Sequence, residues 1–142
     1  MTGLVRRLHS WAAWGLAASV VLQAYLAGAA MANLGGNGDF STHIGVGYSL
    51  PGLLALVVLL TAIIARLGRT QILLSLGLLL LYVIQTSLPY AKSSSPAIAA
   101  LHPANALLLF VAAIWVARRH TVSAAPPVEV PPAGGPPNPD NG

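Results

Sequence analysis

Apolar residues fill four long stretches of the chain, and short polar segments separate them. The stretches cover residues 11–32, 43–65, 70–88 and 97–117, and each of them lacks Asp, Glu, Lys and Arg. A helix needs about 20 mostly apolar residues to cross the hydrocarbon core of a bilayer. The pattern therefore predicts an all-α, four-helix transmembrane bundle over residues 1–120, with its helices running up and down.

The segments between these stretches carry signals that end helices. Residues 33–42 are rich in Gly and Asn, and residues 66–69 form a connection short enough for a tight hairpin between antiparallel helices. Residues 89–96 begin and end with proline. There Ser95 is the expected N-cap residue, and Pro96 is the expected first helical residue of the fourth span.

Basic residues are concentrated at one end of the predicted bundle. Six arginines flank the spans at that end, namely Arg6, Arg7, Arg66, Arg69, Arg118 and Arg119. Lys92 lies at the other end, so the positive-inside rule predicts that both termini are cytoplasmic. The tryptophans adjoin the arginines, whereas Tyr48 and Tyr90 are expected near the outer membrane surface. His9 and His120 also adjoin arginines, which predicts that they lie in the headgroup region.

The two ends of the chain differ from the spans in their signals. Residues 121–142 hold seven of the eleven prolines, which predicts a disordered cytoplasmic tail that acts as a spacer, with partner binding as the alternative. At the start, Arg6, Arg7 and the apolar run up to Ala30-Met31-Ala32 have the layout of a cleaved signal peptide. The run exceeds the roughly 7–15 residues usual there, so a retained span is favoured.

Composition narrows the classes of function. The chain has 142 residues, of which 56% are hydrophobic and 7% charged, against roughly 25% charged residues in soluble domains. The lack of cysteine excludes disulfides, iron–sulfur clusters and thiolate zinc sites. Seven Lys and Arg residues are too few for a nucleic-acid footprint. Motifs for hydrolysis or phosphoryl transfer do not occur, so a non-enzymatic role is favoured and enzymatic activity stays open.

Polar side chains inside the spans are the candidates for function, because they are costly in hydrocarbon. They are Gln23, His43, Ser49, Gln85, Thr86, His102 and Asn105. Gln23, Gln85 and His102 each lie sixteen residues from an arginine at the cytoplasmic end of their span. At a rise of about 1.5 Å per residue, this spacing places the three side chains in one layer about 24 Å from those arginines.

Two interpretations of this layer stay open. In the first, the polar side chains hydrogen-bond across the bundle and fix the register of its helices, each bond adding on the order of 0.6–2 kcal/mol. In the second, the layer lines a small polar site open to the outer face. Ionisable residues inside a membrane often mark functional sites, and His102 is such a residue.

His43 and His102 open the second and fourth spans, which lie diagonally across the core of an up-down bundle. Two imidazoles that face each other across a core suit bis-histidine ligation of one haem iron. Gly47 shares a helix face with His43 and is expected to leave open volume below the imidazole. Pro103 cannot donate a backbone hydrogen bond, so the helix is expected to be strained or broken beside His102.

The depth of the two histidines argues against a shared metal. His43 lies twenty-three residues from Arg66, whereas His102 lies sixteen residues from Arg118. For straight helices, this difference places His43 about 10 Å nearer the outer surface. Asp39, four residues before His43, either orients this histidine or solvates the loop, and the second role is favoured.

Four short motifs occur toward the outer ends of the spans. They are Tyr25-Leu-Ala-Gly28, Phe40-x-x-His43-x-x-x-Gly47, Gln85 and Leu101-His-Pro-Ala-Asn-Ala106. Together these motifs resemble an uncharacterised family of small four-span bacterial membrane proteins, over about residues 4–119. The resemblance implies a multi-pass protein of the bacterial cytoplasmic (inner) membrane. It also implies a role for His43 and His102, but no particular reaction.

The places of His43 and His102 are also similar to those in one half of haem A synthase. Each half of that enzyme is a four-helix bundle with a haem-ligating histidine near the outer ends of its second and fourth helices. This chain has one such half and no cysteine pair in its outer loop. Asp39 precedes His43 by four residues, whereas the enzyme has a glutamate three residues before its histidine. The resemblance therefore implies a haem-binding bundle and not haem A synthesis.

The first functional hypothesis is accordingly a membrane bundle that binds a b-type haem. His43 and His102 would be axial ligands to the iron, Gln23, Gln85 and Asn105 would supply hydrogen bonds around them, and Gly45 and Gly47 would make room for the macrocycle. Electron transfer near the outer face would be the activity, with a quinone or a redox protein as partner. The second hypothesis is a cofactor-free structural or accessory subunit whose polar layer fixes helix packing.

Overall fold

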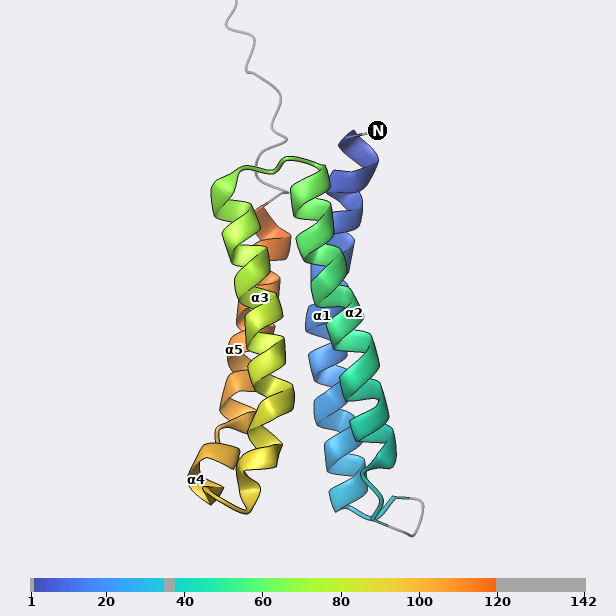
Figure 1. Ribbon diagram of the computed structural model, residues 1–142. Coiled ribbons are helices and arrows are strands. Elements are labelled where there is room, and N and C mark those ends of the chain that lie inside the picture. The colour runs from blue at the N-terminus through green and yellow to red at the C-terminus, as the bar shows by residue number, and fades with distance from the viewer. Residues whose placement is uncertain (1, 35–37, 120–142) are drawn as a thin grey trace, which may run out of the picture.

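A computed structural model of the chain describes residues 2–34 and 38–119, and it is helical throughout its regular elements (Figure 1). The elements are α1 (Thr2–Met31), α2 (Ser41–Ile64), α3 (Arg69–Ser87), the 3-10 turn η1 (Leu88–Lys92), α4 (Pro96–Ala99) and α5 (His102–Arg119). Four spans in this part of the chain are long and apolar enough to cross a membrane. The predicted all-α bundle of four spans is thereby confirmed. The cytoplasmic location of the termini stays a prediction, and the predicted tail lies outside the described residues.

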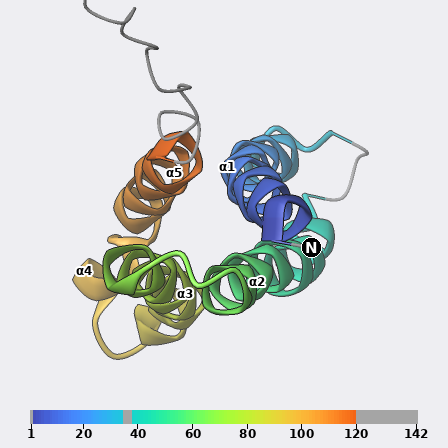
Figure 2. The same cartoon turned by 90° about the horizontal axis from the view of Figure 1, so that it is seen from above.

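The four long helices alternate in direction and pack as a bundle (Figures 1 and 2). α1 packs against α2 and α5, and α3 packs against the same two helices. α2 and α5 therefore lie on one diagonal of the bundle, as predicted, and α1 and α3 lie on the other (Figure 2). This arrangement directs residues on the inner faces of α2 and α5 toward each other.

Helix boundaries follow the local signals in two of the connections. Ser95 is the N-cap residue of α4 and Pro96 is its first residue, as predicted, although the Ser95 side chain makes no capping hydrogen bond. α4 ends after four residues, and α5 begins at His102. Pro103 lacks the amide hydrogen that would continue the helix from α4, so the predicted break beside His102 is confirmed.

The buried core is built largely from small residues and lies toward the end of the bundle that carries the arginines, here called the arginine end. Its members are Ala12, Ala13, Leu16, Ala17, Ala55, Val58, Leu78, Leu109, Ala113, Val116 and Ala117. Small side chains let helix backbones approach closely, which is the main source of packing energy in a membrane. Toward the opposite, histidine end, Ala30 is the one buried residue within 20–34, 38–50, 79–92 and 96–104. The histidine end is therefore half-exposed on its inner side.

His9 is fully buried between the helices at the arginine end, so the prediction that its side chain faces the headgroups was wrong. Its Nδ1 lies 2.9 Å from the carbonyl oxygen of Val58 and 3.1 Å from Oγ1 of Thr61. Its Nε2 lies 3.0 Å from Nε2 of Gln71. The prediction failed because it used only the adjacency of His9 to arginines. On the helix, His9 shares the inward face of α1 with the buried Ala13. His120 lies outside the described residues.

Candidate functional site

The imidazoles of His43 and His102 lie next to each other, edge to face, at the histidine end of the bundle. His43 lies in the first turn of α2, and His102 is the first residue of α5. Their ring centroids are 6.4 Å apart, and the ring planes are inclined at 68°. The diagonal pairing of α2 and α5 thus brings the two sequence-predicted histidines together.

The expected 10 Å difference in depth between the two histidines is absent, because the arginines do not lie at one level. Ser10 Oγ donates to the carbonyl of Ala117, while the neighbouring His9 bonds the carbonyl of Val58. Ala117 and Val58 therefore lie at a similar depth. His102 precedes Ala117 by fifteen residues and His43 precedes Val58 by fifteen, so equal helical rises carry both histidines to one level.

Backbone carbonyls from the other diagonal pair of helices hold one nitrogen of each imidazole. His43 Nδ1 lies 3.1 Å from the carbonyl oxygen of Gln23, on α1. His102 Nδ1 lies 2.9 Å from the carbonyl oxygen of Gln85, on α3. An Nδ1–H that donates to a carbonyl leaves the Nε2 lone pair available, which is the form of histidine that binds metals.

A chain of side-chain hydrogen bonds leads to His102. Asn105 is buried, and its Nδ2 donates to the carbonyl of Leu81 at 2.9 Å and to Oε1 of Gln85 at 2.8 Å. These bonds turn the amide nitrogen of Gln85 toward His102, whose Nε2 it approaches to 3.0 Å. With Nδ1–H donating to a carbonyl, Nε2 accepts this bond. Asn105 therefore orients Gln85, and Gln85 contacts the imidazole.

Gln23 fills the volume that the sequence assigned to open space beside Gly47. With its amide nitrogen turned toward α2, Gln23 donates to His43 Nδ1 at 3.0 Å and to the His43 carbonyl at 2.9 Å, and its oxygen accepts from the Gly47 amide at 3.1 Å. A Cβ added to Gly47 would lie 2.9 Å from a terminal atom of the Gln23 side-chain amide. The expectation of open volume at Gly47 was therefore wrong, whereas a Cβ on Gly45 would meet no atom within 4 Å.

The two arrangements around His43 differ in where the ring carries its proton. Donation from Nδ1 to the Gln23 carbonyl leaves a lone pair on Nε2. Acceptance by Nδ1 of the Gln23 amide hydrogen places the proton on Nε2 instead. Gln23 satisfies either form, so His43 can exchange one for the other without losing its partner on α1.

Other polar residues predicted in this region make hydrogen bonds within their own helix or at its start. Ser49 Oγ donates to the carbonyl of Gly45 at 2.9 Å, and Thr86 Oγ1 donates to that of Val83 at 3.0 Å. Both bonds stay within one helix, and neither joins the two histidines. Asp39 accepts hydrogen bonds from the side chain and the amide of Ser41, which together lower the pKa of its carboxyl. Asp39 thus stabilises the start of α2.

A tyrosine cluster lies near the histidine end, and of its members only Tyr48 and Tyr90 were predicted in this region. The hydroxyls of Tyr48 and Tyr90 are 2.7 Å apart, and the Tyr82 hydroxyl donates to the carbonyl of Tyr48 at 2.8 Å. Gly52 allows this approach, because a Cβ there would lie 2.6 Å from the Tyr82 ring. A glycine in α2 and a tyrosine in α3 were the available signal, but their pairing depends on the rotation of both helices.

The comparisons with known proteins identify one similarity. Residues 23–91 match DUF6220, which is described as a family of unknown function. The matched segment includes Gln23, His43 and Gln85 and ends before His102 and Asn105. No curated protein and no solved structure matches the chain.

Proposed function

We propose that His43 and His102 are the axial ligands of one b-type haem held between α2 and α5, and that the protein takes part in electron transfer. The separation of the two rings is the observation that carries this proposal. Metal–imidazole bonds are about 2 Å long, so two imidazoles on opposite sides of one metal have centroids roughly 6 Å apart. The centroids of His43 and His102 are 6.4 Å apart.

The number of protein ligands favours haem over a bare metal ion. Within residues 2–34 and 38–119, no group of three or more His, Cys, Asp or Glu side chains could hold a metal. Two histidines alone leave zinc under-coordinated, since its sites use three or four protein ligands. Haem iron brings the ligands of its own macrocycle and needs from the protein only axial groups. When bound, haem supplies one-electron oxidation and reduction.

The surroundings of the two rings support the proposal in part. The backbone carbonyls of Gln23 and Gln85 hold the imidazoles by Nδ1, and the inner side of the histidine end is half-exposed. Gly45 adjoins open space, but it lies on another face of α2 than His43 and adds no room between the rings. The Gln85 amide donates to His102 Nε2 and must turn aside before that nitrogen can bind iron. We infer that Asn105 retains Gln85 after this movement, because Asn105 bonds its amide oxygen.

An absorption spectrum tests this proposal. The protein, purified in detergent after expression with added haem, is expected to show a Soret band that sharpens on reduction with dithionite. His43→Ala and His102→Ala should each weaken it, whereas Ser49→Ala, whose hydroxyl bonds only its own helix, should leave it unchanged. His102→Met should instead shift the band and raise the midpoint potential, because methionine ligation favours reduced iron. A folded but colourless wild-type protein at excess haem would overturn the proposal.

The second candidate is a cofactor-free accessory subunit of a membrane complex. One observation favours it: the bonds from Asn105 through Gln85 to His102 are closed within the chain and need no ligand. In that case His102→Ala changes only stability, by on the order of 1–2 kcal/mol.

As partner for the haem-binding protein we propose a quinone or a redox protein of the bacterial inner membrane.

A further inference from the structure

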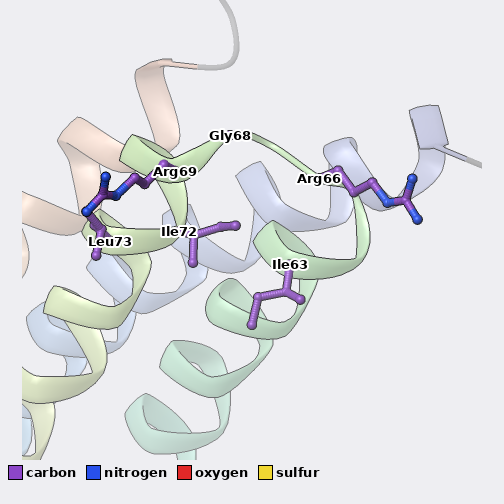
Figure 3. Close-up of a pocket in the computed structure, with 6 residues that line it drawn as sticks. All are labelled: Ile63, Arg66, Gly68, Arg69, Ile72 and Leu73. Carbon is purple, nitrogen blue, oxygen red and sulfur yellow. The ribbon is translucent and has the colours of Figure 1, made fainter.

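A hollow of about 380 Å³ lies at the arginine end, on the outer side of the hairpin between α2 and α3. It is lined by Ile63, Arg66, Gly68, Arg69, Ile72 and Leu73 (Figure 3). Arg66 and Arg69 stand at its two sides, with their side chains extending away from each other (Figure 3). Ile63 and Ile72 lie below them, on the parts of α2 and α3 that would be in the membrane (Figure 3).

The backbone of the hairpin separates the two arginines. α2 ends where Arg66 adopts a left-handed conformation with φ of 50°, and the amide of Leu67 bonds back to the carbonyl of Ala62 at 3.0 Å. Gly68 has φ of 87°, a value that favours glycine, and a Cβ there would meet no atom within 4 Å. The middle of the hairpin is therefore bare, and the hollow is open between the two cationic side chains.

The hollow is apolar along the spans and cationic at their ends, which matches the acyl chains and the anionic headgroup of a phospholipid. Ile63 is 49% exposed and Leu73 is 54% exposed, and both belong to apolar spans. Arg66 lies just beyond the end of α2 and Arg69 is the first residue of α3, the level at which lipid phosphates are expected. Among the described residues, the acidic side chain of Asp39 lies at the opposite end of α2. No acidic group described at the arginine end therefore competes for these arginines.

We propose that this hollow binds an anionic phospholipid. The phosphodiester lies between Arg66 and Arg69, whose side chains must turn toward the hollow from the positions in Figure 3 to contact it, and an acyl chain lies along Ile63 and Leu73. Basic pockets between helices at a membrane surface are suited to anionic headgroups, because charge attraction adds to apolar contact. The arginine pair of α5 differs, since the Arg119 guanidinium already lies 4.4 Å from the centre of the Trp115 ring. The site is independent of the proposed haem.

Native mass spectrometry of the full chain, released from nanodiscs of equal parts phosphatidylglycerol and phosphatidylcholine, tests the proposal. The wild type is expected to retain phosphatidylglycerol selectively. Arg66→Gln with Arg69→Gln should weaken that retention by about an order of magnitude. Arg6→Gln with Arg7→Gln removes the same charge from α1 and should retain the lipid as the wild type does. Equal losses in both double variants would overturn the proposal, because they would show diffuse charge attraction.

A second variant separates the hollow from its charges. Ile63→Trp keeps both arginines and fills the apolar part, so it should reduce the retention of phosphatidylglycerol. Retention equal to that of the wild type would show that the hollow is not used and would overturn the proposal. Inorganic phosphate, added at millimolar concentration, should leave the lipid bound. Displacement by phosphate would show an anion site without acyl contact and would also overturn it.

Discussion

Gln23 occupies the volume next to Gly47 that a side chain at that position would need. An added Cβ on Gly47 would lie 2.9 Å from a terminal atom of the Gln23 amide, which bonds both His43 and the Gly47 backbone when its nitrogen is turned toward His43. The glycine therefore allows α1 to place an amide against the first turns of α2. The position of the His43 ring depends on this contact between two neighbouring helices.

Gly47→Ala should accordingly displace Gln23 and weaken its hydrogen bonds to α2. We expect a loss of about 1 kcal/mol in the free energy of unfolding, the size of an interhelical hydrogen bond in a membrane. Thermal unfolding in detergent measures it. In a Gln23→Ala background the same substitution should have a smaller effect. Gly45→Ala is the control, since an added Cβ there meets nothing within 4 Å and alanine favours helix by about 0.5–1 kcal/mol. Equal losses at both glycines would contradict the role of Gln23.

Gly52→Ala should lower the free energy of unfolding more than Gly47→Ala does, because the neighbouring group is a rigid ring. The added Cβ would lie 2.6 Å from the Cζ and hydroxyl of Tyr82. Overpacking of this kind costs about 1–3 kcal/mol. Tyr82→Phe alone should cost about 1 kcal/mol, from the lost hydrogen bond to the Tyr48 carbonyl. In a Tyr82→Ala background Gly52→Ala should have little effect. An additive double variant would show that the two residues do not meet.

His9→Ala should destabilise the arginine end by about 2 kcal/mol, because it leaves the buried amide of Gln71 on α3 without its bond to His9. Thr61 and Val58 on α2 keep the bond between them. Chemical unfolding monitored by circular dichroism checks this value. His9→Gln is the matched variant, since its amide can replace part of the hydrogen bonding, and it should recover some of the loss. A loss below about 0.5 kcal/mol in His9→Ala would show that these bonds contribute little.

Acid should loosen the start of α2 through Asp39. Bonds from the Ser41 side chain and amide lower the pKa of this carboxyl in the folded protein, so the ionised form stabilises the fold. That contribution is present above the unfolded pKa of about 3.9 and is lost as the pH falls through the lower folded value. Amide exchange at Ser41 should increase over this range. Asp39→Asn should show no such pH dependence, and an identical acid response in that variant would contradict the prediction.

Hydrophobic patterning was sufficient for the four spans, because each apolar stretch is long enough to cross a bilayer. The diagonal pairing of His43 with His102 followed from the alternation of helix direction. The relative depth of the two histidines did not follow from the sequence. It was counted from arginines, which mark the ends of apolar runs but do not lie in a common plane. Arg66 lies in the hairpin beyond α2, whereas Arg118 lies within α5. The relative depth of His43 and His102 could be obtained only from contacts in the structure, such as that of Ser10 with Ala117.

Helix rotation was the other quantity that the sequence could not supply. Spans that are apolar on every side show little difference between the face toward the core and the face toward lipid. The burial of His9 and the approach of Tyr82 to Gly52 both depend on rotation. Both were therefore invisible in the pattern, although the residue types were present. Gln85 and Asn105 were found because polar groups stand out in such spans.

The alanine-rich core at one end of the bundle has a consequence for how the molecule fluctuates. Close helix contacts at the arginine end should resist opening, while the four helix ends around His43 and His102 share almost no buried apolar contact. The amplitude of helix motion should therefore increase along the bundle axis from the arginine end to the histidine end. Such a gradient would let the histidine end spread to bind the proposed haem while the opposite end keeps the helices in register.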